Sequence, residues 1–249
     1  MARIVLPPYH PNAFILDGVA DYFYKDSSVV TAAPVTFSAW FWASTTYPSN
    51  STLVAQNTST LQAGFGTFGL NLITSGRVEF RTGSSGASSA ALSINGVYPT
   101  QLWTHAAGVS ASATSRFAYR NGIAGTENVT SRVPAAIDRT AIGANRDSTP
   151  SDFFPGAIAH AAIWNVALTS GEIRQLANGV SPWFVRREGL VAYWPLVQSG
   201  LPPGHDVSLT YPLTHSTQNY NVVAGPFANP RVLWNLQTAA DALLGQACL

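Results

Sequence analysis

The chain has 249 residues and a net charge of +1, and only 10% of its residues are charged, well under the roughly 25% of an average soluble domain. The positive residues are scattered, which argues against a basic stripe that tracks a phosphate backbone, and no run of about 18 apolar residues is present. We therefore expect neither nucleic acid nor a membrane as a partner. A surface so poor in charge suits a protein that is packed into an assembly.

The amino-terminal apolar run stops at Pro7 and Pro8, too early for the apolar region of a secretory signal. Cys248 is the single cysteine, so an intrachain disulfide cannot form. We therefore expect a protein without a signal peptide.

Short β-type runs separated by turn residues fill positions 13–165, which predicts an all-β sandwich rather than alternating strands and helices. The run 35–44 places Phe37 and Phe41 on one face, with Trp40 and Trp42 on the other. Bulky apolar groups on both faces indicate a central strand. The side chains expected in the core are Phe37, Ala39, Phe41, Trp103, Val109, Ile142, Ile158, Ile163 and Trp164.

Further strands are predicted at 77–81, 102–110 and 116–120. The last of these meets Asn121-Gly122, two residues that tolerate the positive φ angles of a tight hairpin turn. A β-hairpin is therefore expected there.

A capping-box pattern at Thr169-Ser-Gly-Glu172 predicts a short helix, which ends at Asn178-Gly179. The segment 181–230 is richer in Pro and Gly, and its strand-like run 189–196 is expected to add to the same sandwich. Beyond it, apolar residues recur at helical spacing, which predicts an amphipathic carboxy-terminal segment.

These segments, in this order, resemble the laminin-G-like jelly roll of the concanavalin A-like lectin/glucanase superfamily. The resemblance rests on the run 13–22, on 35–44, on Trp103-Thr-His-Ala-Ala-Gly-Val109, on Tyr119-Arg-Asn-Gly122 and on the run 154–165. It implies one domain over residues 1–230, with a core of 13–180, additional strands in 181–230, and a separate segment 231–249.

The resemblance is to the variant that is often found in phage structural proteins and bacterial surface proteins. It therefore implies a non-enzymatic structural or adhesive module, a virion protein of the capsid surface (decoration or cement) or of the tail. The expected partners are other virion proteins and further copies of the chain. The resemblance also implies that the protein is made in a host cytoplasm without a signal peptide. The alternative is a lectin-like module that binds carbohydrate at a surface, and a glycoside hydrolase ranks third.

Hydrolases of the superfamily need two carboxylates about 5–9 Å apart on the two sides of the sugar bond. The four glutamates, Glu79, Glu127, Glu172 and Glu188, are isolated from other acids in the sequence. We predict no catalytic residues and no enzyme.

A sugar ring stacks on flat aromatic side chains, and Trp40 and Trp42 are the candidates because they share a strand face. Related domains often bind Ca²⁺, which requires six to eight oxygen ligands. The oxygen donors available are Asp17, Asp21, Asn145, Asp147 and Asp152, although turn formation explains these residues as well, and His160 stands where related domains often have an acid. We predict no resident cofactor.

The apolar stripe of the segment 233–249 must be covered, because an exposed stripe is an aggregation liability in a chain with so little charge. We expect another subunit to cover it, with the chain's own sandwich as the alternative. The docking side chains are Leu236, Ala240, Leu243 and Leu244.

Overall fold

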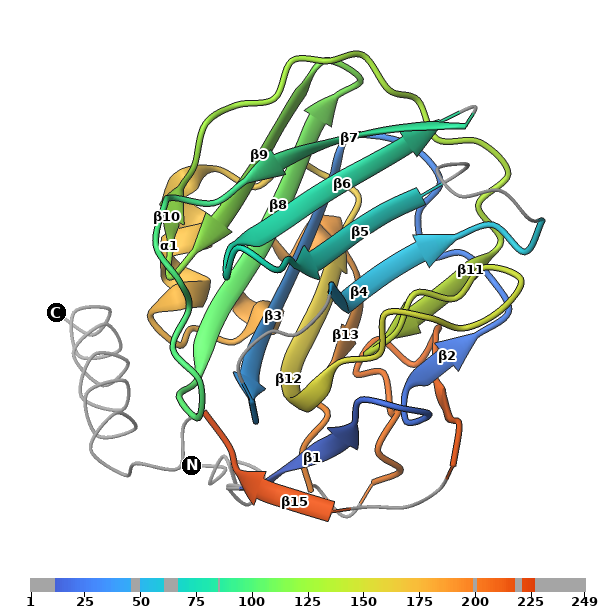
Figure 1. Cartoon of the computed structure of the whole chain (residues 1–249), viewed down its shortest axis with the longest axis vertical. Coiled ribbons are helices and arrows are strands. Elements are labelled where there is room, and N and C mark those ends of the chain that lie inside the picture. Colours follow the sequence, from blue (N-terminus) through green and yellow to red (C-terminus); the bar gives the residue numbers. More distant parts are fainter. Residues whose placement is uncertain are drawn as a thin grey trace, which may run out of the picture.

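The computed structural model describes residues 12–45, 50–60, 67–84, 86–198, 201–217 and 221–226. Within these ranges the chain forms two antiparallel β-sheets packed face to face, with one α-helix (Figure 1). The prediction of an all-β sandwich with one short helix is confirmed. No helix in the described ranges has the length and apolar character needed to cross a bilayer.

Sheet A forms one layer of the sandwich. Its strands, in spatial order, are β10 (Ile123–Ala124), β9 (Ser115–Arg120), β8 (Thr104–Ser112), β3 (Val35–Ala43), β12 (Pro155–Trp164), β1 (Asn12–Asp17) and β15 (Asn221–Ala224). The second half of β12 also pairs with β13 (Leu190–Trp194). The two ends of the described chain meet here, since β1 and β15 pair from Asn12 opposite Ala224 to Ile15 opposite Asn221.

Sheet B forms the other layer. Its strands, in spatial order, are β14 (Thr214–His215), β2 (Phe23–Lys25), β11 (Arg139–Ile142), β4 (Ser51–Asn57), β5 (Thr67–Leu72), β6 (Val78–Ser84) and β7 (Ala87–Leu92). The strand-like run expected at 189–196 and the residues after it thus contribute strands to both sheets.

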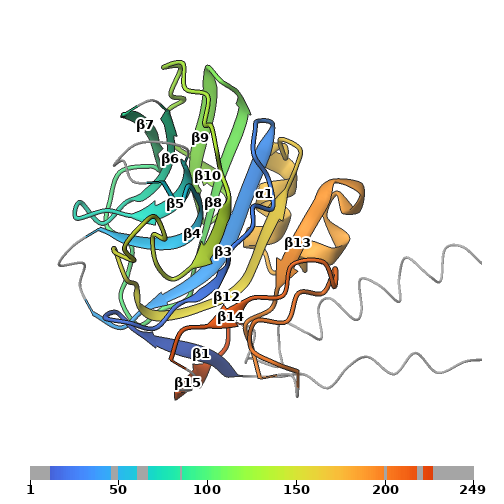
Figure 2. The same cartoon turned by 90° about the vertical axis from the view of Figure 1, so that its right-hand side faces the viewer.

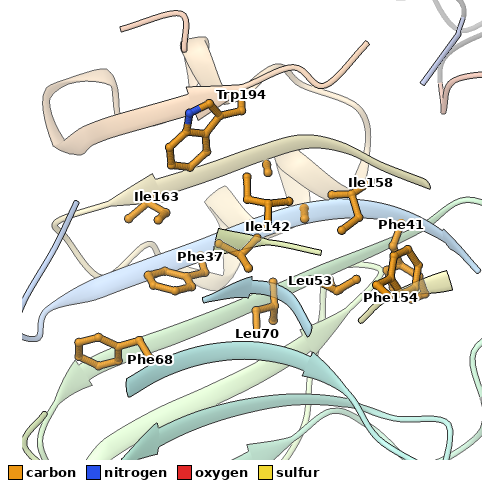
Figure 3. Close-up of a cluster of buried hydrophobic side chains, with 14 of the residues drawn as sticks. Phe37, Phe41, Leu53, Phe68, Leu70, Ile142, Phe154, Ile158, Ile163 and Trp194 are labelled. Carbon is orange, nitrogen blue, oxygen red and sulfur yellow. The ribbon is translucent and has the colours of Figure 1, made fainter. Parts of the chain in front are cut away.

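The hydrophobic core lies between the two sheets and is built from alternate residues of facing strands (Figure 3). Phe37 and Phe41 of β3 are fully buried there, and Phe37 packs edge-on against Phe80 with ring centroids 5.6 Å apart. Gly108 of β8 makes room for this ring, because a Cβ at that position would lie 2.0 Å from a carbon of Phe80.

Eight of the nine side chains predicted for the core are buried, and the prediction for Trp103 is wrong. Trp103 is half-buried on the outer face of sheet A, where its indole Nε1 donates a hydrogen bond of 2.8 Å to the carbonyl of Ala224. Val109 and Trp164 also point to the outer face and are buried there by other segments.

The helix α1 (Ser170–Ala177) covers part of this outer face (Figure 2). Its capping box is formed as predicted: Thr169 Oγ1 accepts from the backbone N–H of Glu172, whose carboxylate accepts from the N–H of Thr169. Two 3₁₀ turns, η1 (Pro182–Phe184) and η2 (Arg187–Gly189), return the chain to β13.

The hairpin predicted at Asn121-Gly122 is confirmed. Both residues have positive φ, 49° and 79°, and they join β9 to β10.

Candidate functional site

A group of aromatic and polar side chains gathers on the outer face of sheet B, and we call it the sheet B cluster. Phe23 of β2 points into the core, so its neighbours Tyr22 and Tyr24 point outward by the alternation of a strand. The loop 143–154, which connects β11 to β12, packs against them from the other side. The cluster consists of Tyr22, Tyr24, Asp26, Asn57, Arg139, Asn145, Arg146, Asp147 and Phe153.

The aromatic part of the cluster is a row of three rings. The ring centroid of Tyr22 lies 5.4 Å from that of Tyr24 and 5.9 Å from that of Phe153. The guanidinium of Arg146 lies 4.2 Å above the Tyr24 ring, within the range of a cation–π contact. Burial raises the pKa of the Tyr22 hydroxyl.

The charges of the cluster neutralise one another. Arg146 is hydrogen-bonded to the carboxylate of Asp26, and Arg139 lies 3.6 Å from the same carboxylate. The Asp26 side chain is 60% exposed, so solvent reaches the acid while both arginines are more buried.

Side-chain amides continue this polar surface. Asn57 of β4 donates 2.7 Å to Asn145, which donates 3.1 Å to the Asp147 carboxylate. The oxygen of the Asn57 amide accepts a hydrogen bond from the backbone N–H of Arg146. The loop is thereby held against the sheet in one arrangement, with donors and acceptors side by side.

Hydrogen bonds join four of the predicted calcium donors in two pairs, Asp17 with Asp21 and Asn145 with Asp147. The Asp17 carboxylate accepts three backbone N–H groups at 2.8–2.9 Å, from Val19, Ala20 and Asp21. Burial acts to raise its pKa, but these hydrogen bonds outweigh it and the pKa of Asp17 is lowered.

The other predicted donors also form hydrogen bonds within the chain. Asp21 accepts a hydrogen bond from the Thr217 hydroxyl. The Asp147 carboxylate accepts hydrogen bonds from the Asn145 amide and from the backbone N–H of Thr149. Asp152 accepts the N–H of Thr52 through its carbonyl. In the described ranges no three acidic, histidine or cysteine side chains are placed to hold a metal ion, and calcium binding by the predicted oxygen donors stays a prediction.

Trp40 and Trp42 lie together on the outer face of sheet A, as their shared strand face predicts. They belong to a group that we call the tryptophan patch, whose side chains are all partly exposed: Ile15, Trp40, Trp42, Trp103, Val197 and Val223. Three buried alanines, Ala13, Ala157 and Ala159, lie beneath them. Sugar contact at Trp40 and Trp42 stays a prediction.

A serine–histidine pair lies beside this patch. Ser38 Oγ is 2.9 Å from Nε2 of the fully buried His105, and the other ring nitrogen of His105 has no hydrogen-bond partner. Burial lowers the pKa of His105 to about 3. Without a carboxylate to orient the ring, the pair does not form a catalytic triad.

His160 is held within the fold by its backbone position and by a hydrogen bond. It lies at a bulge of β12 with φ of 51°, and its Nδ1 is 2.7 Å from the hydroxyl of Tyr193. A small cavity beside it is lined by Ser38, Trp40, His160, Leu176, Val180 and Pro182.

The docking residues Leu236, Ala240, Leu243 and Leu244 lie outside the described residues. Sequence reasoning selected Asn145 and Asp147 of the sheet B cluster but missed Tyr22, Tyr24 and Arg146. The two tyrosines flank Phe23, and this alternation was the available signal for an outward-facing aromatic pair.

A family model described as the concanavalin A-like lectin/glucanases superfamily, of the laminin G type, matches residues 17–174. No curated protein matches the chain.

Solved structures with the same fold are distant in sequence. A candidate carbohydrate-binding protein from Bacteroides ovatus is 18% identical with a TM-score of 0.60, over 88% of this chain but only 61% of its own. The heptameric SAP-like pentraxin of Limulus polyphemus is 14% identical with a TM-score of 0.55, over 70% and 85% of the two chains.

Domain 4 of an extracellular arabinanase from Geobacillus stearothermophilus, solved in complex with arabinotriose, is 19% identical with a TM-score of 0.51. The match covers 66% of this chain and 75% of that domain. At these identities the likeness shows the fold alone.

Proposed function

Because the chain belongs to the concanavalin A-like lectin/glucanases superfamily, we propose that it is a non-catalytic carbohydrate-binding module. The sheet B cluster is the observation that carries the proposal. A pyranose presents an apolar face to an aromatic ring and a rim of hydroxyls to amides and charged groups. The part of the Tyr24 ring that the Arg146 guanidinium leaves exposed offers the apolar surface, and Asp26 and Asn145 offer polar partners beside Arg146.

The similar structures support this proposal at the level of ligand class. One is described as a candidate carbohydrate-binding protein and another was solved with arabinotriose, which are properties of those proteins. For the present chain they favour the lectin-like alternative over the virion interpretation that ranked first on sequence.

The environment of the glutamates favours binding over hydrolysis. Glu79 pairs with Arg81 at 2.8 Å, and Glu172 pairs with Arg186 at 2.7 Å. Glu127 accepts the hydroxyl of Ser115. In the sheet B cluster the Asp26 carboxylate is paired with arginine, so it is not poised as a proton donor beside a second acid.

The test is a glycan array with the full chain, followed by calorimetry of the best saccharide against Tyr24→Ala. We expect the variant to lose about tenfold or more in affinity, which corresponds to about 1.4 kcal/mol. Phe184→Ala is the matched control, because Phe184 is a 78% exposed aromatic side chain on the 3₁₀ turn η1 and belongs to sheet A's side of the molecule.

Two results would contradict the proposal. One is an array without a saccharide-specific signal. The other is binding that survives Tyr24→Ala but is lost in Trp42→Ala, which would move the sugar to the tryptophan patch.

A structural role in a virion is the second candidate. Its specific support is the charge-poor composition, with 10% charged residues, together with the apolar carboxy-terminal segment. In this proposal the protein lies on the capsid or tail surface and contacts other virion proteins and further copies of itself. Mass spectrometry of purified particles from the source tests it, and absence from the particles would contradict it.

A further inference from the structure

The outer face of sheet A is covered unevenly. The helix α1 and the segment that follows it pack over β8 and over the second half of β12, from Ala162 to Trp164. Ile173 and Leu176 of α1 are buried there, and Trp164 is 0% exposed. Over the first half of β12, at Ala157 and Ala159, the partly exposed side chains of the tryptophan patch form the outermost layer among the described residues. One half of this face has a helical cover and the other half shows apolar side chains.

The described chain ends beside the half of this face on which the tryptophan patch is partly exposed. Val223 of β15 belongs to the tryptophan patch, and the carbonyl of Ala224 accepts the hydrogen bond from the Trp103 indole. The last described residue is Pro226, two positions further on. The described chain therefore ends at the edge of the patch.

The sequence that follows has the pattern of a helix with one apolar face. The stripe repeats at helical spacing, and Asp241 is the one charged residue within 233–249. Residues 227–232 separate Pro226 from the start of the stripe, and six extended residues can span up to about 20 Å. This length is enough for the stripe to turn back over the patch. Its apolar residues are Leu233, Leu236, Ala240, Leu243, Leu244 and Ala247.

We propose that residues 233–249 dock on the tryptophan patch of their own chain and supply the missing helical cover of sheet A. The short tether favours this occupant over another subunit, since it holds the segment near the patch at an effective concentration of about millimolar. Docking within one chain also avoids the loss of translational freedom that association of two molecules entails. The exit point thus favours the alternative that the sequence analysis ranked second.

Cys248 provides a probe of this contact, because it is the single cysteine of the chain. A benzophenone attached to its thiol should cross-link under light to peptides that contain Trp40 and Trp42, Trp103 or Ile15. A mixture of ¹⁴N- and ¹⁵N-labelled protein should give cross-links within one isotope only. Mixed-isotope cross-links would overturn docking on the same chain and show that a second copy exchanges its segment.

Hydrogen exchange measures the docked helix without any label. We expect the amides of 233–249 to be protected in the wild type, and Leu243→Asp to remove the protection and the cross-links. The matched control is Ala242→Asp, which places the same charge one residue earlier on the opposite side of the helix and should leave both signals in place. Random-coil exchange of 233–249 in the wild type would overturn the proposal.

The proposal is separate from the proposed function. Because the sheet B cluster lies on the other layer of the sandwich, Leu243→Asp should not change saccharide affinity, whereas Tyr24→Ala should not change the cross-links.

Discussion

The outer faces of the two sheets differ in chemistry although the sheets share one core. On sheet B, arginines, carboxylates and amides lie beside tyrosine rings, and their charges are paired across three segments of the chain. On sheet A, tryptophan, alanine and valine side chains meet, and α1 buries one half of the face. A mixed aromatic and polar surface suits a hydroxyl-rich ligand, whereas an apolar surface suits another piece of protein. This difference is the basis on which we propose ligand binding at sheet B and packing at sheet A.

The largest expected effect tests the packing role of sheet A. Trp164→Ala removes a fully buried indole and its 2.9 Å hydrogen bond to the carbonyl of Val185, so we expect a loss of about 3–5 kcal/mol in the free energy of unfolding. Trp42→Ala, at a half-exposed position on the same face, should cost clearly less. Urea unfolding measures both variants, and equal losses would contradict the division of this face into a covered and an uncovered half.

The second largest effect is a loss of stability at acid pH, which we expect from two buried histidines of sheet A. Burial lowers the pKa of His105 to about 3 and that of His160 to about 4, from an ordinary value of 6.5. Both rings are therefore neutral in the folded protein at a pH where the unfolded chain already binds protons. The free energy of unfolding is therefore unaffected by these two histidines above about pH 6.5, and it decreases as the pH falls from there toward 4 and 3.

At pH 4.5 the loss from His105 alone should be roughly 2–3 kcal/mol relative to pH 7. His105→Gln should flatten this part of the pH dependence, whereas His205→Gln, at a half-exposed position, should not. Urea unfolding at a series of pH values is the measurement. The same acid slope in His105→Gln and in the wild type would show that His105 does not carry it.

A smaller effect tests the cover that α1 provides. Thr169→Ala removes the hydroxyl of the capping box and should cost about 1 kcal/mol of stability. Gln175→Ala, an exposed position in the same helix, should change stability by less than about 0.5 kcal/mol. If thermal unfolding shows no difference between the two variants, the cap does not contribute to the cover.

The smallest effect is expected from calcium. In the sheet B cluster Arg139 and Arg146 supply the positive charge beside Asp26, and the Asp17 and Asp147 carboxylates already accept backbone N–H groups. We therefore expect neither EDTA nor millimolar Ca²⁺ to shift the thermal unfolding midpoint or the saccharide affinity. A rise of several degrees with Ca²⁺ would mean that the loop 143–154 rearranges around the ion.

The fold was predictable because its signals are local. Alternation in 35–44, the positive-φ pair Asn121-Gly122 and the capping box at Thr169 each determine a short piece of backbone, and the structure confirms all three. Trp103 was misplaced because alternation assigns a face of a strand but not what covers it. Its indole instead meets Ala224, a residue 121 positions away.

The sheet B cluster was predictable only in part, for the same reason. Asn145 and Asp147 could be selected as oxygen-bearing residues of one loop. Their partners come from distant strands: Asn57 lies 88 positions from Asn145, and Asp26 lies 120 positions from Arg146. Charge pairing across such distances leaves no periodic trace in one sequence, so the pairing of Arg139 and Arg146 with Asp26 could not be foreseen.

The pairing of β1 with β15 also determines how the domain responds to force. The strands are antiparallel, and the chain enters and leaves the sheet at the same end, with Asn12 opposite Ala224. Tension applied through the two ends therefore separates the paired residues one pair at a time, beginning with Asn12 and Ala224. It does not load all the hydrogen bonds between the two strands in shear at once. The domain should peel open from this edge at low force, while the interior strands of sheet A keep their hydrogen bonds.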